Sequence, residues 1–289
     1  MTTRREFLTQ AALLTTCALA TTESLMAKPD SRVGLQLYSL REQLPKDIKG
    51  VITKVAAAGY KEVETYGYSK QNGFWGMNAG AFSQLLKHNG LTTPSGHYGL
   101  DQYLTGGQLD ELNYIIEAAK TTGQTYITVP SLGSAYPKSF DGFKSTAEKL
   151  NKAGELCKRA GLALAYHNHA AEFKAVNATT LYEVLLTETD KNLVQFEMDL
   201  YWVVRAGQSP VSIMQRHPGR FAMVHIKDMD KTKPELNTEV GAGSINFKEI
   251  VANANSAGIK HFIVEQENFS IDPYQSITQS CSYVKNSLL

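Results

Sequence analysis

The sequence predicts an α/β fold of the (β/α)8 class, a TIM barrel that forms a single domain. Short apolar runs alternate along the chain with longer segments of helical periodicity, which is typical of parallel strands joined by helices. After a short N-terminal segment about 260 residues remain, and this length suits eight such units. Glycine follows five helical segments and precedes the next apolar run, where a left-handed helix cap belongs. These are Gly59, Gly90, Gly123, Gly161 and Gly258.

Apolar runs rich in Val, Ile, Leu and Tyr are predicted as the eight strands. In chain order they are Val33–Leu40, Glu62–Tyr66, Thr92–Tyr98, Thr125–Val129, Ala163–His169, Val194–Asp199, Phe221–Lys227 and His261–Gln266. A doubly wound open sheet is the alternative arrangement. It is disfavoured because no glycine-rich phosphate turn follows the first strand, where the sequence continues LYSLREQL.

Segments with a helical period separate these strands and complete the repeating unit. They are Pro45–Ala58, Ala79–His88, Gln108–Thr122, Phe140–Ala160, Ala178–Leu186, Pro210–Arg216, Phe247–Ala257 and Pro273–Leu288. Alternation of this kind places every strand parallel to its neighbours, with the helices outside the barrel.

Residues 1–28 are predicted to be a Tat-type signal peptide, and residues 29–289 the barrel. Arg4 and Arg5 precede the uncharged run Leu8 to Thr22, which is the pattern of a twin-arginine export signal. The run is too short and too polar for a comfortable membrane span. A frayed amphipathic helix and a lipidated cysteine are the alternatives. Export implies a periplasmic or exported protein without stable membrane insertion after processing.

The composition limits the partners. The formal net charge is +1, and no cluster of Lys and Arg lies outside the signal, which argues against a nucleic-acid surface. Cys157 and Cys281 lie in separate predicted helices and have no zinc-site spacing, so we expect two buried thiols, with a disulfide as the alternative. A homo-oligomer is left open.

Polar residues end one predicted strand after another, and in a barrel the C-terminal strand ends gather the chemistry. Asp199, His225 and Glu265 end three successive strands. Two carboxylates that face each other in a buried site repel, and a divalent cation removes that conflict. Mixed oxygen and nitrogen ligands suit one ion of Mn²⁺, Mg²⁺, Co²⁺ or Zn²⁺. Taken singly, each residue is equally consistent with helix capping or a satisfied polar contact.

Further polar residues on the same strand ends are candidates for catalysis. The fifth strand ends in LAYHNHAAEF, where His167 and His169 share one face of the strand. Imidazole is suited to proton transfer because its pKa lies near working pH, so both are candidate acid/base groups. Lys227 lies on the same face as the predicted ligand of its strand and is a candidate for oxyanion stabilisation. A salt bridge from Lys227 to Asp228 or Glu197 is the alternative.

Candidate substrate-binding residues lie at the same end of the predicted barrel. Glu64, His97 and Glu267 offer hydrogen bonds to a substrate. The alternatives are a salt bridge for Glu64, support of a metal ligand for His97 and contact with water for Glu267. Aromatic faces suit the C–H surface of a sugar ring, so we assign stacking roles to Tyr38, Trp202 and Trp75, with packing as the alternative. The residues are Glu64, His97, Tyr38, Trp202, Glu267 and, less directly, Trp75.

Six segments together resemble a known family. They lie at the first, second, fifth, sixth, seventh and eighth strands and read GLQLYSLRE, AAAGYKEVETYGY, HNHAAEF, FEMDLYW, VHIKD and VEQE. In this order they resemble the sugar phosphate isomerase/epimerase family, of the xylose isomerase-like TIM barrel superfamily. The resemblance spans about Val33 to Leu288 and is weakly specific for substrate. The export signal is similar to that of the branch that contains hydratases and lyases of 3-keto-glycosides.

The resemblance implies a metal site with one ligand from each of strands five to eight. It places three ligands at Asp199, His225 and Glu265, in agreement with the reasoning from the strand ends. Strand five departs from the epimerase pattern, because Ala165 stands where those enzymes have an acidic residue. We expect Glu172 as the fourth ligand, with His169 as the alternative. This departure puts a mechanism with two opposed glutamate bases in doubt.

The expected function is divalent-metal-dependent proton transfer on a sugar or keto-sugar. The cation would polarise a substrate carbonyl or hydroxyl, while a base removes the neighbouring proton. Isomerisation, epimerisation and hydration or elimination all fit this scheme, with a small-molecule carbohydrate as the partner and no nucleic acid. An apurinic endonuclease-like phosphodiesterase is disfavoured by charge, and an exported non-catalytic carbohydrate-binding barrel is the other alternative.

Overall fold

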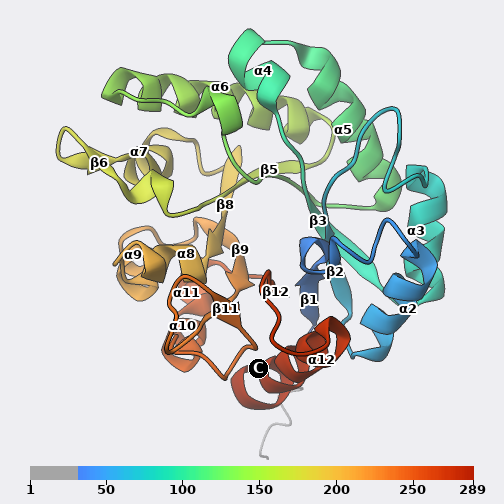
Figure 1. The fold of residues 1–289 in the computed structure, drawn as a ribbon. Helices are drawn as coiled ribbons and strands as arrows, with labels where there is room; N and C mark the ends of the chain where they lie inside the picture. Colours follow the sequence, from blue (N-terminus) through green and yellow to red (C-terminus); the bar gives the residue numbers. More distant parts are fainter. Residues whose placement is uncertain (1–31) are drawn as a thin grey trace, which may run out of the picture. The chain divides into compact units, whose positions relative to one another are not determined.

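Eight parallel strands close into a barrel in the computed structural model, which describes residues 32–289 (Figure 1). Around the barrel the order is β1-β12-β9-β8-β5-β4-β3-β2, so each chain neighbour among these eight is also a spatial neighbour. The strands are β1 (Val33–Gln36), β2 (Glu62–Thr65), β3 (Thr92–His97), β4 (Tyr126–Val129), β5 (Ala163–His167), β8 (Val194–Asp199), β9 (Phe221–Ile226) and β12 (His261–Val264). The predicted fold class is confirmed, and the open sheet is wrong. The predicted signal peptide lies outside the described residues.

The α-helices lie outside the ring of strands, as Figure 1 shows. They are α2 (Ile48–Ala57), α3 (Ala79–His88), α4 (Asp101–Gly106), α5 (Leu109–Thr122), α6 (Phe140–Arg159), α7 (Leu181–Glu188), α8 (Leu200–Arg205), α9 (Pro210–Arg216), α10 (Phe247–Ala252), α11 (Ala254–Ala257) and α12 (Pro273–Tyr283). Within residues 32–289, no helix has the length and apolar character needed to span a bilayer.

Short elements complete the connections between strands and helices. The 3-10 helices are η2 (Leu37–Leu40), η3 (Gly133–Ala135) and η4 (Ala171–Phe173), and the π-helix η5 (Val284–Leu288) follows α12. Two small antiparallel pairs join β6 (Ala175–Val176) to β7 (Thr179–Thr180), and β10 (Asp228–Met229) to β11 (Asn237–Thr238). These elements lie in the loops and leave the barrel strands undisturbed.

The helix caps follow the predicted glycine pattern. All five predicted glycines have positive φ, between 67° at Gly90 and 101° at Gly59. At Gly123 and Gly258 the left-handed residue directly ends α5 and α11, and its backbone N–H bonds the last turn. Because L-residues rarely adopt this conformation, glycine here ends each helix and turns the chain toward the next strand.

Several predicted boundaries are wrong for local reasons. The first strand ends at Gln36, because the side chain of Gln36 caps Tyr38 N and starts η2. Helix α7 begins at Leu181, since Ala178 has positive φ and Thr180 supplies the N-cap. The predicted helix Phe247–Ala257 is interrupted at Asn253.

Apolar side chains form a floor inside the barrel. Tyr126, Ala165, Met223 and Ile263 are buried together. Three of them lie two residues before His167, His225 and Glu265, so they share the inward face of their strands. The polar layer at the C-terminal end of the barrel therefore lies directly above a layer of buried apolar side chains. The thiols of Cys157 and Cys281 are free and buried outside the barrel, as predicted.

Candidate active site

Four buried side chains from neighbouring strands meet at the C-terminal end of the barrel. They are His167, Asp199, His225 and Glu265, and their ligand atoms all lie within 4.8 Å of one another. Strand register sets this meeting, since Asp199 is paired directly with His225 across β8 and β9. The predicted trio of Asp199, His225 and Glu265 is thus brought together in one place.

The distances within this cation group, the four residues just named, suit a small cation. His225 Nδ1 lies 3.3 Å from Glu265 Oε2 and 3.8 Å from Asp199 Oδ2. His167 Nε2 lies 3.4 Å from Asp199 Oδ2. Both His167 Nε2 and Asp199 Oδ2 are buried without a hydrogen-bond partner. A buried polar atom without a partner is costly, and a bound cation would satisfy both atoms at once.

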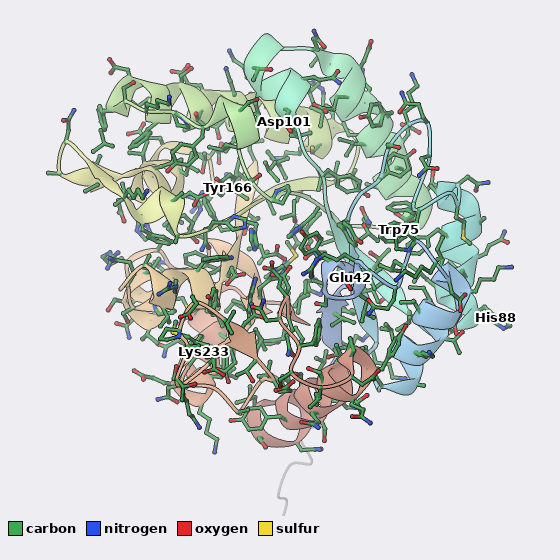
Figure 2. The ribbon with its side chains drawn as sticks, in the orientation of Figure 1. Glu42, Trp75, His88, Asp101, Tyr166 and Lys233 are labelled. Carbon is green, nitrogen blue, oxygen red and sulfur yellow. The ribbon has the colours of Figure 1, made fainter. Side chains whose placement is uncertain are left out.

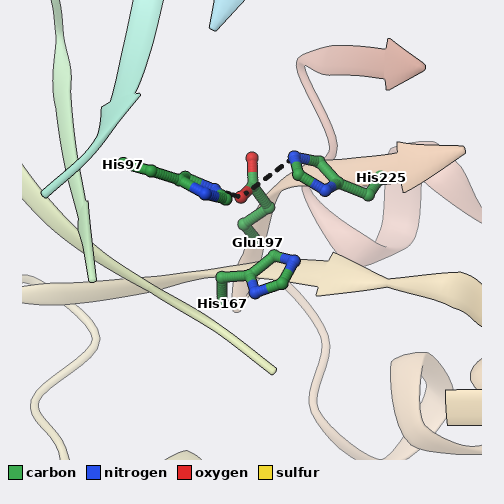
Figure 3. A group of neighbouring side chains, drawn as sticks. All are labelled: His97, His167, Glu197 and His225. Atoms are coloured by element: carbon green, nitrogen blue, oxygen red, sulfur yellow. Dashed lines mark hydrogen bonds and ion pairs between the residues drawn. The ribbon is translucent and has the colours of Figure 1, made fainter. Parts of the chain in front are cut away.

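A second group overlaps the first and lies beside it. It comprises His97, His167, Glu197 and His225 (Figure 3). His97 Nε2 lies 2.7 Å from Glu197 Oε2, and His225 Nε2 lies 3.2 Å from the same oxygen. Glu197 Oε1 is buried without a hydrogen-bond partner. The sequence predicted Glu197 only as a partner of Lys227, yet its inward direction follows from its place two residues before Asp199.

Charge is balanced within the buried layer by imidazole and carboxylate groups. Burial opposes protonation of His225, but the carboxylates of Glu197 and Glu265 outweigh it and hold its pKa well above the ordinary value. Burial likewise opposes ionisation of Glu197 and Glu265, but His225 beside Glu197 and Lys227 beside Glu265 hold both carboxyl pKa values well below their usual range. A cation in this layer would take the place of protons on the imidazoles.

Lys227 is fully buried and paired with acidic groups. Its Nζ donates to Glu265 Oε2 at 3.0 Å and to Glu267 Oε1, and lies 4.0 Å from Asp199 Oδ2. Burial lowers the pKa of Lys227, but these carboxylates outweigh it and raise the pKa above the ordinary value. The alternative partners Asp228 and Glu197 are therefore wrong.

Asp228 instead organises the loop that follows β9. Its carboxylate accepts backbone N–H groups from Met229, Gly241, Gly243 and Ile245. Four such bonds saturate the two oxygens and hold the segment that follows β11, from Gly241 to Ile245, against Asp228. This explains why a carboxylate next to Lys227 does not pair with it.

A cavity of about 360 Å³ opens onto the cation group. It is lined by Tyr38, Tyr66, Gly67, His97, Gly99, Pro130, His167, His169, Trp202, Glu265 and Glu267. The volume and the mixture of aromatic and polar walls are typical of a small-molecule site. Four predicted substrate residues line it: His97, Tyr38, Trp202 and Glu267. Trp75 packs behind this wall, with its ring centroid 5.1 Å from that of Tyr66.

Glu64, predicted as a substrate residue, lies beneath the cavity and does not line it. Its side chain is fully buried and accepts from Gln36 Nε2 and Ser95 Oγ, both at 2.6 Å. His225 Nε2 lies 2.7 Å from the same carboxylate. The prediction of an inward Glu64 is right in direction, but its depth in the barrel separates it from any ligand in the cavity.

Glu172, predicted as the fourth ligand, lies outside the cation group. Its Oε1 accepts from Tyr166 OH at 2.8 Å, and its Oε2 accepts from His169 N at 3.0 Å. Tyr166, labelled in Figure 2, is fully buried on the opposite face of β5 from the cation group. Glu172 therefore lies outside the group that could hold a cation, and His167 is the member of that group that comes from β5.

His169 faces the cavity beyond the end of β5. Its ring centroid lies 4.9 Å from that of His167 and 5.4 Å from that of Trp202. Burial, together with the neighbouring His167, lowers the pKa of His169 to about 3, so the imidazole is neutral at ordinary pH. A neutral imidazole in the cavity can accept a proton from a ligand.

The residues fit a divalent cation on chemical grounds. Two imidazole nitrogens and two carboxylate oxygens form a mixed donor set that suits Mn²⁺, Co²⁺ or Zn²⁺, and Mg²⁺ less well. The two unpartnered buried atoms of His167 and Asp199 face this set. The four side chains of the cation group are the observation that supports binding of a divalent cation.

Fold and site together define a (β/α)8 barrel with a histidine and carboxylate centre at its C-terminal mouth. The profile of the "Xylose isomerase-like TIM barrel" family matches residues 52–286. The chain therefore belongs to the xylose isomerase-like TIM barrel family.

Two similar proteins carry names that refer to sugars or related compounds. A sugar phosphate isomerase/epimerase from Parabacteroides distasonis is 28% identical, with a TM-score of 0.79 over 91% of this chain and 96% of that one. An inosose dehydratase from Clostridium perfringens is 26% identical over 181 residues, 56% of this chain and 60% of that protein. The chain thus spans about three fifths of the length of this curated relative.

More distant structures show the fold alone. An AP endonuclease of family 2 from Brucella melitensis is 13% identical, with a TM-score of 0.69 over 89% of this chain and 99% of that one. The family of barrels is therefore broader in chemistry than the sugar-related relatives, and the site residues must carry any functional argument.

Proposed function

We propose that the protein is a divalent-metal-dependent enzyme that transfers a proton next to a carbonyl or hydroxyl group of a sugar or keto-sugar. The cation is held by His167, Asp199, His225 and Glu265. The names of the relatives support isomerisation, epimerisation and dehydration as reaction types. Elimination or hydration of a keto-glycoside belongs to the same chemistry.

One observation carries the proposal: His167 Nε2 and Asp199 Oδ2, buried 3.4 Å apart without a hydrogen bond, face two further donors at the floor of the cavity. A binding protein for neutral sugars would not require this buried charge. Burying carboxylates and imidazoles without a purpose is costly, so a ligand that uses them is expected.

Residues that line the cavity, together with Lys227 buried beside Glu265 and Glu267, divide the chemistry among them. When bound, the cation supplies Lewis-acid polarisation of a substrate oxygen. His169, neutral and in the cavity, accepts the proton from the neighbouring carbon. Lys227 stabilises negative charge that develops on the substrate oxygen. Glu267, which is about one third exposed and hydrogen-bonded to Lys227, orients a substrate hydroxyl or returns the proton.

Tyr38 and Trp202 flank the ligand in this scheme. Tyr38 is 38% exposed, and Arg41 lies over its ring at 4.7 Å, so its position is fixed at the rim. Trp202 packs against His169 on the wall of the cavity. Aromatic surfaces at these two places favour a sugar ring and keep bulk water from the carbon that loses its proton.

We also propose that the protein is exported through the Tat pathway to the periplasm or beyond. The proposal rests on Arg4, Arg5 and the uncharged run that follows them. Replacement of both arginines by lysine would retain an exported protein in the cytoplasm. Equal fractions outside the cytoplasm for both forms would contradict export by this route.

Metal analysis of the purified protein tests the proposed function. We expect about one equivalent of Mn, Co or Zn in protein prepared without chelator, and loss of that metal in Asp199→Asn. Asparagine retains an oxygen for the N-cap bond that Asp199 Oδ1 accepts from Trp202 N, so helix α8 should persist. Glu62→Gln is the matched control, because Glu62 is also a buried carboxylate bonded to a histidine, His261.

Turnover then separates an enzyme from a carbohydrate-binding barrel. Wild type is assayed with aldoses, ketoses, inososes and 3-keto-glycosides, and the products are followed by NMR in D₂O. Solvent deuterium next to a carbonyl, absent with Asp199→Asn, supports the proposal. Absence of metal after reloading with Mn²⁺, Co²⁺ and Zn²⁺ would refute it, and sugar binding without turnover would favour the non-catalytic alternative.

A further inference from the structure

We infer that Glu64 is a positioning residue that holds the imidazole of His225 with Nδ1 directed at the cation. Glu64 does not line the cavity; its Oε2 lies 2.7 Å from Nε2 of His225, the candidate ligand from β9, and 3.2 Å from Nε2 of His97, which lines the cavity. The inference rests on the proposed cation site and assigns a role to a glutamate that neither substrate nor cation would touch.

The backbone N–H of Tyr38 determines the direction of the hydrogen bonds that link Gln36 to Glu64. Tyr38 N can only donate, and it donates to Gln36 Oε1 at 3.0 Å. The amide nitrogen Nε2 of Gln36 must therefore face the other way, and it donates to Glu64 Oε2 at 2.6 Å. Glu64 Oε2 is thus an acceptor, fixed by the start of η2 in the first βα loop.

The second oxygen of the carboxylate is fixed as well. Ser95 Oγ lies 2.6 Å from Glu64 Oε1, and Thr128 Oγ1 lies 2.8 Å from Ser95 Oγ. Thr128 can donate to Ser95 while Ser95 donates to Glu64, so each hydroxyl is satisfied. The carboxylate is therefore held from β1, β3 and β4, and it cannot turn away from His225.

This fixed acceptor determines the tautomer of His225. Its Nε2 lies 2.7 Å from Glu64 Oε2, closer than the 3.2 Å to Glu197 Oε2. Nε2 therefore carries the hydrogen, and in the neutral ring Nδ1 carries the lone pair. Nδ1 is the nitrogen that faces Asp199 and Glu265. A carboxylate behind a metal-binding histidine is a recurrent device that fixes the ring and increases its basicity.

The same arrangement decides between the two overlapping groups. A cation placed between His97 and Glu197 would need a lone pair on His225 Nε2, and that nitrogen donates to Glu64. A cation among His167, Asp199 and Glu265 uses His225 Nδ1 and leaves the Glu64 bond intact. Glu64 therefore directs the cation to the face of the layer that contains Asp199.

Two substitutions at Glu64 test the role without relying on activity. Glu64→Met keeps a similar volume but removes the acceptor, and we expect Zn²⁺ or Co²⁺ to bind about 10- to 100-fold more weakly by calorimetry. Glu64→Gln rescues the affinity to within a few-fold of wild type, because the amide oxygen accepts from His225 while the NH₂ donates to Ser95.

Glu62→Met is the matched control. Glu62 lies two residues earlier on the same face of β2, is buried, and pairs with His261 Nδ1 at 2.9 Å. It removes an equivalent buried glutamate–histidine contact away from the cation group, so metal affinity should equal that of wild type. Equal weakening by Glu62→Met and Glu64→Met would overturn the inference.

A zinc-bound crystal structure of the unaltered protein provides a test that does not depend on the folding of a variant. We expect the anomalous peak of zinc at His225 Nδ1, with Nε2 still bonded to Glu64. A peak between His97 and Glu197, or wild-type affinity in Glu64→Met, would overturn the role of Glu64 while leaving a metal-dependent function in place. Failure of wild type to bind any cation would overturn both.

Discussion

The hydroxyl of Tyr166 donates to Oε1 of Glu172 across the outer side of β5 at 2.8 Å. The other oxygen, Oε2, accepts from the backbone of His169. Together the two bonds tie the η4 turn to the strand end and keep the carboxylate of Glu172 away from the cation group. The turn positions His169, and His167 takes the place that a carboxylate would otherwise occupy.

Separate substitutions of His167 and Glu172 test whether His167 binds the cation while Glu172 only holds the turn. His167→Ala removes one nitrogen donor, and we expect cation affinity to fall at least tenfold, which calorimetry with Zn²⁺ would measure. Glu172→Gln keeps both positions able to form hydrogen bonds, and we expect cation affinity close to that of wild type. Its effect should be a modest fall in kcat, because the backbone of His169, the proposed base, then bonds to a neutral amide oxygen in place of a carboxylate. The opposite order of affinities would restore Glu172 as the ligand.

Lys227→Met tests how much the positive charge of Lys227 stabilises the buried carboxylates of the site. Lys227 neutralises Glu265 and Glu267, so its loss leaves buried carboxylates unpaired, at a cost of about 3 to 5 kcal/mol. We expect a lower Tm in EDTA, tighter binding of Mn²⁺ and recovery of Tm when Mn²⁺ is added, because the cation replaces the lost positive charge. Turnover should still be lost. An unchanged Tm in EDTA would show that the pairing contributes little.

Tryptophan fluorescence can report on ligand binding, since the chain has two tryptophans in different places. Trp202 lines the cavity, and Trp75 packs behind Tyr66. A bound sugar should change the emission of Trp75→Phe, which retains Trp202. The same sugar should leave the emission of Trp202→Phe nearly constant. Equal responses of the two variants, measured with the best ligand of the assay panel, would place the ligand elsewhere.

The two buried cysteines should be inert in the folded protein. Burial raises the pKa of Cys157 to about 12 and that of Cys281 to about 11, so the thiolate fraction at pH 8 is very small. We expect iodoacetamide at pH 8 to label neither residue until guanidinium is added, as peptide mass spectrometry would show. Both thiols should then react without a reductant, because neither forms a disulfide. Rapid native labelling at either position would contradict this packing.

Much of the barrel could be predicted because its signals are local. A glycine at a helix end is recognised from the backbone conformation required at that one residue. An apolar run is recognised from residues that are adjacent in the chain. Helix α8 was missed because its six residues are too few to show a helical period and it begins directly after the strand end at Asp199. The boundary at Gln36 was missed because its cap depends on a side-chain bond.

The sequence predicted those residues of the candidate site whose inward direction depends only on the alternation of side chains along a strand. Asp199, His225 and Glu265 follow from the alternation of faces on three strands. The same alternation could have identified Glu197, although not its bond to His97. Glu172, predicted as a ligand, lies outside the cation group because its oxygens accept bonds from Tyr166, on the opposite face of β5, and from the backbone of His169. The depth of Glu64 depends on the stagger of β2 against β3, where the register shifts between Glu62 and Glu64.

The four members of the cation group come from β5, β8, β9 and β12, which are neighbours in the barrel. The aromatic rim that includes Tyr38 and Tyr66 comes from the loops after β1 and β2. The cation group and this part of the rim thus come from separate segments of the sequence, whereas Trp202 and Glu267, which also line the cavity, follow two of the strands that hold the cation group. Under the proposed function, exchange of the loops after β1 and β2 would therefore change only part of the ligand contacts and leave the four cation donors in place.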